Sequence, residues 1–227
     1  APVTQAPRLK EAFEAAGFRV QVAPALAKAL QAASNEARKS SGGLQARLDV
    51  AARVLAQRGA KLCNYQAQGA AWLAPCDRAL LGDQQGLGKT LQLLVAAPQD
   101  GPILVLCPSV AKGVWQREAA AFRPDLTADA LAGTGSARWP GSRELVAMNY
   151  EILPSTMAEL AAAREVGEPL KHEDEADAFW AGVPDGATLI IDEAHYLKSN
   201  KTLRTDRART LIKAVLRRGG RVYGLTG

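Results

Sequence analysis

The feature that most constrains this chain is a glycine-rich loop that follows an apolar run and precedes a helical pattern. The loop is Gly86-Leu87-Gly88-Lys89-Thr90. Glycines let several backbone N–H groups converge on one anion, and the N-terminus of the next helix adds a favourable dipole. In such loops the lysine reaches the β- and γ-phosphates of a nucleotide, and the threonine offers its hydroxyl to Mg²⁺. We therefore predict a site for ATP and Mg²⁺ in which Lys89 and Thr90 have these roles.

The loop departs from the strict phosphate-loop pattern at one position. That pattern has glycine five residues before Gly88, where this chain has Asp83. Taken by itself, the loop is therefore compatible with a chance or degenerate match, and its meaning depends on what surrounds it.

A pair of carboxylates follows another apolar run much later in the chain. Residues 188–191 read Thr-Leu-Ile-Ile, and Asp192-Glu193 comes directly after them. In an open parallel sheet, ligands bind at the carboxyl ends of strands, where the glycine-rich loop also lies. We expect Asp192 to hold Mg²⁺ through water, and Glu193 to position or deprotonate the attacking water. The predicted catalytic set is thus Lys89, Asp192 and Glu193, with simple helix-capping acids as the alternative for the pair.

Short apolar runs alternate with helical patterns from about residue 62 onwards. Strands are predicted in five segments, 78–81, 102–107, 144–148, 188–191 and 221–225. Helices are expected to begin near Gly88 and to cover 110–122. Continuous apolar strands separated by helices are typical of a mainly parallel sheet flanked by helices on both faces, so the predicted fold class is α/β.

The expected organisation is one α/β lobe with additions. Residues 1–60 are Ala-rich and predict an accessory helical segment, with apolar residues at helical spacing over 44–55. The lobe is expected over 61–227, with an acidic insertion at about 155–186. We expect the acidic residues of the insertion to form a solvated surface, and the alternative is a regulatory or partner-binding surface.

Composition excludes some classes of protein and leaves others open. The apolar runs are far shorter than the ~18 residues of a membrane span, so no membrane partner is expected. The net charge of +5 permits nucleic-acid binding without requiring it. Cys63, Cys76 and Cys107 are too scattered for a zinc site or a disulfide framework, which predicts free thiols. We expect an intracellular protein, cytoplasmic in a bacterium or phage and nuclear in a eukaryote.

Together these motifs resemble those of the Swi/Snf-like ATPases, the chromatin-remodeller branch of the superfamily-two helicases. The resemblance runs in order from about residue 62 to 227 and implies a RecA-like P-loop fold. The loop is similar to the family's Asp-Glu-Met-Gly-Leu-Gly-Lys-Thr, which accounts for Asp83, whereas Gln84 and Gln85 depart from that pattern.

Further motifs of the resemblance lie on both sides of the loop. Leu62, Gln66 and Gly69 look like the upstream motif whose glutamine reads adenine, so the resemblance assigns Gln66 to the base. His195 resembles the histidine that links the hydrolytic site to the following motif. Residues 225–227, Leu-Thr-Gly, look like the start of that motif.

The resemblance also implies a surface that faces nucleic acid. Ser109 and Trp115 look like parts of the motif after the second strand, and in the family that motif and the region around Asn149 face the nucleic-acid backbone. Ser109, Lys112 and Asn149 are therefore candidate phosphate contacts, which contribute affinity without sequence readout. Trp115 also stands at helical spacing from apolar neighbours, so a core position is its alternative. The basic run over 204–221 has three possible interpretations: a surface that tracks DNA, a contact with another lobe, or a solvated helix face.

The implied function is that of the N-terminal, ATP-binding lobe of a DNA-dependent ATPase that moves on double-stranded DNA. Such motors hold ATP between two RecA-like lobes, and the resemblance covers the first, so the second lobe is an expected partner. The chain alone is expected to be nearly inactive, because arginine fingers from the second lobe contribute roughly 10³ to 10⁵ in turnover. The alternatives are a restriction-type translocase, an RNA helicase and a non-motor nucleotide-dependent switch.

Overall fold

The computed structural model describes residues 43–168, 170–199 and 202–227. These residues contain one parallel sheet. Its six strands lie in the order β1-β6-β5-β2-β4-β3, and every neighbouring pair is parallel. The strands are β1 (Arg78–Leu81), β2 (Ile103–Cys107), β3 (Thr127–Ala130), β4 (Glu144–Asn149), β5 (Thr188–Ile191) and β6 (Arg221–Leu225). The predicted α/β class and the five predicted strands are confirmed.

Strand β3 is an edge strand that the sequence pattern does not predict. Its residues read Thr-Ala-Asp-Ala, and none of them is fully buried. It pairs with β4, with Thr127 opposite Glu144 and Ala130 opposite Ala147. Because an edge strand is less enclosed than a central one, it does not need the continuous apolar run that marks the other strands.

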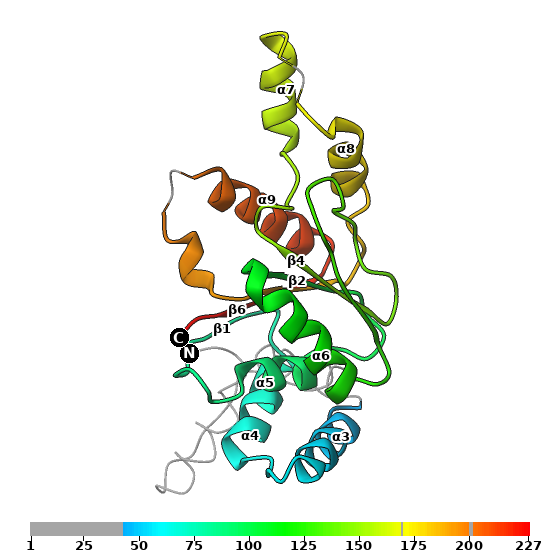
Figure 1. Cartoon of the computed structure of the whole chain (residues 1–227), viewed down its shortest axis with the longest axis vertical. Coiled ribbons are helices and arrows are strands. Elements are labelled where there is room, and N and C mark those ends of the chain that lie inside the picture. Colours follow the sequence, from blue (N-terminus) through cyan, green and yellow to red (C-terminus); the bar gives the residue numbers. More distant parts are fainter. Residues whose placement is uncertain (1–42, 169, 200–201) are drawn as a thin grey trace, which may run out of the picture. The chain divides into compact units, whose positions relative to one another are not determined.

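Helices cover both faces of the sheet (Figure 1). The α-helices are α3 (Leu44–Gln57), α4 (Asn64–Leu73), α5 (Lys89–Ala96), α6 (Lys112–Phe122), α7 (Met157–Glu165), α8 (Glu173–Ala181) and α9 (Leu203–Arg217). Two short 3-10 helices, η2 (Ser109–Ala111) and η3 (Ala194–Leu197), follow β2 and β5. In Figure 1, α3 to α6 lie on one side of the strands and α9 on the other. The helix predicted over 110–122 corresponds to α6.

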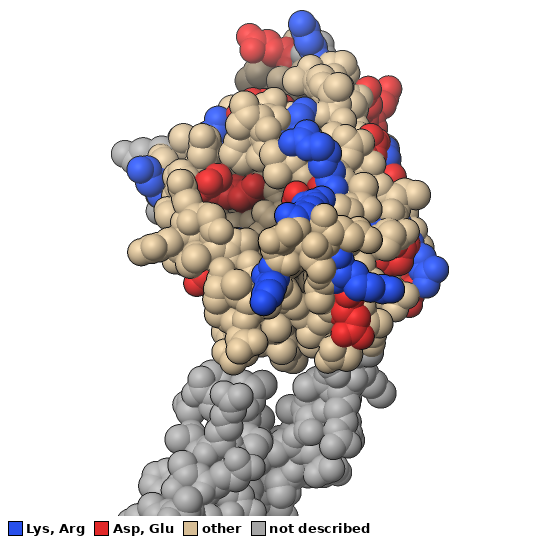
Figure 2. Space-filling view, turned by 60° about the horizontal axis from the view of Figure 1, so that its bottom comes forward, with Lys and Arg blue, Asp and Glu red and all other residues tan. Residues whose placement is uncertain are grey.

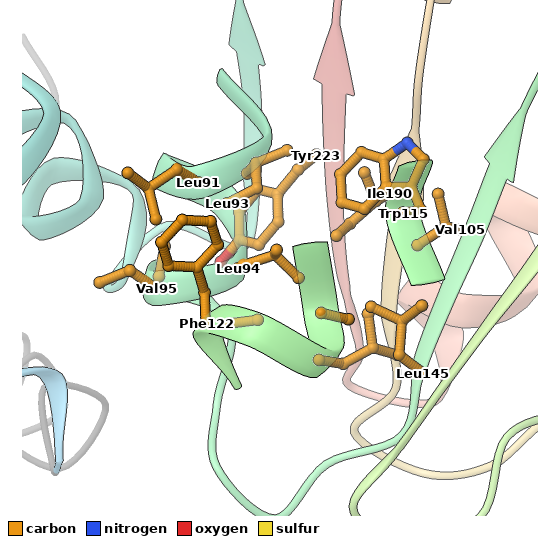
Figure 3. Packing of buried hydrophobic residues seen from close by; sticks show 14 of the residues in the cluster. Leu91, Leu93, Leu94, Val95, Val105, Trp115, Phe122, Leu145, Ile190 and Tyr223 are labelled. Atoms are coloured by element: carbon orange, nitrogen blue, oxygen red, sulfur yellow. The ribbon is translucent and has the colours of Figure 1, made fainter. Parts of the chain in front are cut away.

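The sheet separates two hydrophobic clusters, and β2 shows how its strands supply both. Val105 and Cys107 belong to the cluster beneath α5 and α6, whereas Leu104 and Leu106 belong to the cluster on the α9 side. Figure 3 shows the first cluster, with side chains of α5 and α6 packed over the strands. Successive strand residues point to opposite faces, so an entirely apolar strand is what a sheet covered on both sides requires.

A buried arginine holds the C-terminal end of α6 against the C-terminal end of α5. The Arg123 side chain is fully buried and donates to the backbone oxygens of Leu94 (2.8 Å), Ala97 and Pro98, and to the Asp125 carboxylate. Burial alone would raise the pKa of Asp125, but its hydrogen bonds and ion pair with Arg123 lower that pKa below its usual value. The two helices that carry the candidate site are therefore fixed to each other by charge-assisted hydrogen bonds.

Helix α3 packs against the α/β lobe, although it lies before the boundary expected near residue 60. Residues 43–227 form one compact unit, and Leu44, Leu48 and Leu55 of α3 pack against the cluster beneath α5 and α6. The sequence pattern shows where α3 is helical but not which surface covers its apolar stripe. The accessory helices expected over 1–42 lie outside the described residues.

The segment expected as an insertion forms α7 and α8, which lie beyond α9 at one end of the lobe (Figure 1). Arg207 of α9 joins it to the lobe: its guanidinium is 2.7 Å from the Glu159 carboxylate of α7 and also donates to the backbone oxygen of Leu153. Acidic residues of α8 pair within the insertion, since Arg164 contacts Glu173 and Asp177. Two of the insertion's acidic residues are therefore paired within the insertion itself.

The basic run over 204–221 is largely engaged within the lobe. Arg204 pairs with Glu151, Arg218 pairs with Asp185, and Arg221 donates to the backbone oxygen of Ala74. Figure 2 shows one face of the lobe, where acidic side chains lie in a hollow and basic side chains lie beside it. These contacts favour a structural role for this run over a continuous DNA track.

Candidate functional site

The loop after β1 and the carboxylates after β5 meet in one cleft at the carboxyl ends of the strands. The cleft has a volume of about 460 Å³. Its lining includes Gln66, Gly86, Gly88, Lys89, Thr90, Asp192 and Glu193. Of the residues predicted for the nucleotide, only Leu87 is missing from this lining. Its backbone oxygen accepts hydrogen bonds from two glutamine side chains. Parallel strands bring these segments to the same edge of the sheet, as the topology rule requires.

The glycine-rich loop has the backbone shape that its composition predicts. Gly86 and Gly88 have φ values of 82° and 71°, in the left-handed region that other residues rarely adopt. Lys89, at the start of α5, donates from Nζ to the backbone oxygens of Asp83 (2.6 Å) and Gln84 (3.0 Å). The ammonium thus lies inside the loop, where phosphate oxygens would replace neutral carbonyl acceptors with charged ones.

Two glutamine side chains contact the loop through the backbone oxygen of Leu87. Nε2 of Gln66 and Nε2 of Gln92 donate to this oxygen at 3.3 and 3.4 Å. Gln66 also accepts from the N–H of Cys63 at the start of α4, and the buried Gln92 is 3.4 Å from the Asp83 carboxylate. Asp83, which stands where the strict pattern has glycine, is therefore part of a polar network that supports the loop.

Gly69, in the middle of α4, is needed for the close approach of Gln92. A Cβ atom at residue 69 would lie 1.9 Å from Oε1 of Gln92, whose side chain is 1% exposed. Glycine inside a helix costs roughly 0.5–1 kcal/mol relative to alanine. A glycine is thus required here for a steric reason, because α4 packs directly against the Gln92 side chain that contacts the phosphate loop.

Replacing Gly69 with alanine is expected to weaken nucleotide binding about tenfold, because the new methyl group displaces the Gln92 amide from Asp83 and Leu87. ATP affinity measured by titration calorimetry checks this. Gly101→Ala is the matched control, since the nearest atom to a Cβ there is 3.6 Å away. Unchanged affinity, together with the added stability that alanine normally gives a helix, would show that Gln92 does not support the loop.

The Asp192 carboxylate is fixed by hydrogen bonds to both of its oxygens. Oδ2 accepts from the indole Nε1 of Trp115 at 2.8 Å, and Oδ1 accepts from the backbone N–H of Glu193 at 2.9 Å. The backbone oxygen of Asp192 accepts from the Tyr150 hydroxyl at 2.6 Å. Burial and the nearby Asp192 raise the pKa of Tyr150, so its hydroxyl remains protonated as a donor. Burial, with Asp192 again nearby, also raises the pKa of the Cys107 thiol to about 12.

Glu193 links the cleft to the last strand. Its φ is 52°, a left-handed conformation that costs a non-glycine residue of order 1–3 kcal/mol and is concentrated at functional sites. Oε2 of Glu193 is 3.1 Å from Nδ1 of His195. The same ring nitrogen is 3.4 Å from the hydroxyl oxygen of Thr226, just after β6. His195 therefore stands between the candidate catalytic carboxylate and residues 225–227, where the resemblance expects a coupling residue.

The chemistry of the donor set fits Mg²⁺. Thr90 and Asp192 line the same cleft with a hydroxyl and a carboxylate, and hard cations prefer oxygen ligands. In the described part of the chain, no group of three or more His, Cys, Asp or Glu side chains is arranged to hold a metal ion. Mg²⁺ is usually bound through one or two carboxylates and substrate phosphates, and water completes its shell.

The three candidate nucleic-acid contacts lie at the ends of neighbouring strands. Nζ of Lys112 donates to Oδ1 of Asn149 at 2.9 Å and to the backbone oxygen of Leu131. Nδ2 of Asn149 in turn donates to the Glu151 carboxylate. Ser109 begins η2 and is exposed. The structure thus brings Lys112 and Asn149 together, in a network that already engages both side chains.

Two features of the site are absent from the sequence analysis. Trp115 occupies the core position that its helical spacing offered as the alternative, and its indole also donates a hydrogen bond to Asp192. Leu55 and Arg58, at the end of α3, also line the cleft, and Arg58 lies 5.0 Å from the ring centre of Phe122. No motif marks either feature, because each depends on contacts between segments far apart in the chain.

Fold and loop together define the chain as a RecA-like α/β lobe of the P-loop class. The model of the SNF2-related domain matches residues 65–217, and the chain belongs to this family. No helix among the described residues combines the length and the apolar character needed to cross a bilayer.

Similar proteins carry the same domain within much longer chains. Over 163 residues the chain is 30% identical to the Caenorhabditis elegans homolog of SWI/SNF-related matrix-associated actin-dependent regulator of chromatin subfamily A-like protein 1, covering 69% of this chain and 21% of that protein. It is 30% identical to mouse chromodomain-helicase-DNA-binding protein 1-like, covering 64% and 16% of the two chains. For mouse DNA annealing helicase and endonuclease ZRANB3 the identity is 26%, with 74% and 14% covered. The chain therefore spans about a fifth or less of these relatives.

Among solved structures, the chain is similar to the Sulfolobus solfataricus SWI2/SNF2 ATPase core in complex with double-stranded DNA. The identity is 22% and the TM-score 0.48, and the match covers 74% of this chain and 32% of that one.

Proposed function

We propose that this chain is the N-terminal, ATP-binding lobe of a Swi/Snf-like DNA-dependent ATPase that couples hydrolysis to movement on double-stranded DNA. The observation that carries the proposal is the meeting of Lys89, Asp192 and Glu193 in one cleft of a chain from the SNF2-related family. The names of its relatives, a regulator of chromatin and two helicases, support the same class of activity.

The side chains predicted for the nucleotide, the metal ion and hydrolysis each have a proposed task. The backbone of residues 86–88 and the Lys89 ammonium bind the phosphates, and Gln66 contacts the adenine base. Thr90 and Asp192 hold Mg²⁺, which when bound neutralises charge on the β- and γ-phosphate oxygens. Glu193 orients the attacking water and accepts its proton. His195 transmits the state of Glu193 to residues 225–227, a role that its contacts with Glu193 and Thr226 support.

The proposed substrate surface for DNA is the end of the sheet that carries Ser109, Lys112 and Asn149. A DNA phosphate there would compete with Asn149 and Leu131 for the Lys112 ammonium, which keeps hydrogen bonds in both states. Such contacts neutralise backbone charge and carry no sequence information, as expected for an enzyme that moves along DNA.

A second RecA-like lobe is the proposed partner in hydrolysis. The cleft opens at the carboxyl ends of the strands, and the catalytic side chains predicted in it come from one lobe only. The proposed protein acts inside the cell, in the cytoplasm of a bacterium or phage host or in a eukaryotic nucleus. ATPase assays of a two-lobe protein with duplex DNA, single strands and RNA test the proposal. Stimulation by duplex DNA above the other two is expected, and stimulation by RNA alone would indicate an RNA helicase.

Replacing Lys112 with alanine is expected to weaken duplex binding by a similar factor on unrelated sequences and to lower the salt slope of binding by about one. Fluorescence anisotropy at several salt concentrations measures both quantities. Lys171→Ala is the matched control, because it removes an exposed lysine of the insertion, outside the candidate DNA contacts and the basic run. An unchanged salt slope would exclude Lys112 as a phosphate contact.

A further inference from the structure

We propose that Trp115 is a positioning residue for Asp192, and that its indole N–H holds the carboxylate in the orientation that metal binding requires. The inference rests on the proposed nucleotide site and adds a residue to it from α6. Nothing in the chemistry of tryptophan makes it a metal ligand, so its effect must pass through Asp192.

The geometry leaves the Asp192 carboxylate little freedom to rotate. Nε1 of Trp115 is 2.8 Å from Oδ2, and the Glu193 N–H is 2.9 Å from Oδ1. An indole N–H that donates to an ionised carboxylate forms a charge-assisted bond, which is stronger than a bond between neutral groups. Each oxygen keeps a lone pair for an ion or its water, but rotation about the carboxylate axis would break both bonds.

The donor itself is held rigidly. Trp115 is 1% exposed, and its ring belongs to the cluster beneath α6. Figure 3 shows the ring beside Val105 and Ile190, with the indole nitrogen at the edge of the cluster. Ile190 precedes Asp192 by two residues on β5, so the strand that delivers the carboxylate also packs against its donor. A supporting shell that is fixed by packing is what keeps a metal ligand in its productive orientation.

The indole serves two separable purposes at this position. Its ring fills the core, which a phenylalanine ring would largely do as well. Its N–H donates to Asp192, which phenylalanine cannot do. The chain offers a control, because Trp139 is partly buried against the other cluster and also donates from Nε1, to the backbone oxygen of Phe179 at 2.8 Å.

The experiment compares Trp115→Phe with Trp139→Phe in the whole chain, with ADP as the probe. Its affinity is measured by calorimetry with Mg²⁺ and again in EDTA, and the ratio gives the metal-dependent gain. For Trp115→Phe we expect this gain to fall about tenfold, while the affinity in EDTA stays within about twofold of the wild type. Trp139→Phe is expected to keep the wild-type ratio.

Epistasis separates positioning from general damage to the fold. Asp192→Asn should itself reduce the metal-dependent gain, and adding Trp115→Phe should then change nothing further, because the indole acts through that carboxylate. Additive losses would overturn the inference, and so would a Trp115→Phe variant with the wild-type ratio. If the wild type shows no metal-dependent ADP binding, the proposed function fails, which is a different result.

A measurement without substitution at Trp115 covers the case in which that variant does not fold. The indole N–H signals of ¹⁵N-labelled protein are assigned through Trp72→Phe, Trp139→Phe and Trp180→Phe, which leaves Trp115 by elimination. The Trp115 signal should move when Mg²⁺ is added to the ADP-bound chain and when Asp192 is replaced by asparagine. A Trp115 signal that moves in neither case would overturn the inference.

Discussion

Replacing Lys89 with alanine is expected to lower the affinity of the chain for ATP and Mg²⁺ roughly 100-fold. The Lys89 ammonium lies inside the phosphate loop, 2.6 Å from the backbone oxygen of Asp83 and 3.0 Å from that of Gln84. Each hydrogen bond to a charged group contributes about 1.5–3 kcal/mol, so losing the contacts with two phosphates reaches this size. The loss should appear in the binding constant and not in the folded structure, because only neutral carbonyl acceptors are released.

Titration calorimetry with ATP and Mg²⁺ measures this effect, and circular dichroism verifies the fold. Lys213→Ala removes the same charge from an exposed position of α9 and is expected to bind as the wild type does. Lys89→Arg keeps the charge in a larger group and should recover only part of the affinity. An alanine variant that binds within threefold of the wild type would mean that the loop does not hold phosphates.

Replacing Glu193 with glutamine is expected to slow ATP hydrolysis roughly 10²- to 10⁴-fold in a two-lobe protein while ATP still binds. The amide has the shape of the carboxylate but cannot accept the proton of the attacking water. Glu193 lines the cleft beside Asp192, and its backbone has a φ of 52°. That conformation is independent of the charge on the side chain, so the loop should keep its shape.

Turnover and ATP affinity are measured on the same preparation, because only their divergence identifies a catalytic group. Glu165→Gln makes the same change at an exposed position of α7 and is expected to leave both unchanged. Equal losses of affinity and turnover would assign Glu193 to binding, and unchanged turnover would remove it from the catalytic set.

Much of the fold could be predicted because its central strands are buried on both faces. A strand such as β2, all of whose residues are buried, appears in the sequence as a continuous apolar run. The edge strand β3 lacks that signal, so the sequence pattern does not predict it. The pattern shows that α3 is helical, but it cannot show that the apolar stripe of α3 packs against the cluster beneath α5 and α6.

In the candidate site, too, local sequence patterns predict some features, and only the packing reveals others. The phosphate loop and the carboxylate pair were predicted because each is a run of adjacent residues, placed by the strand before it at one edge of the sheet. The hydrogen bond from Trp115 to Asp192 joins residues 77 positions apart and leaves no periodic trace in the sequence. The packing of Gly69 against Gln92 is of the same kind.

The sequence by itself therefore determined the fold class, five of the six strands and the chemical groups at their ends. Local patterns carry this information, since burial requires apolar runs and phosphate binding requires glycines beside a helix start. Only the tertiary structure decided which groups hold those residues in place: Trp115 for Asp192, Gln92 for the loop and α3 for one wall of the cleft. Orientation depends on contacts between distant segments, and such contacts exist only after the chain has folded.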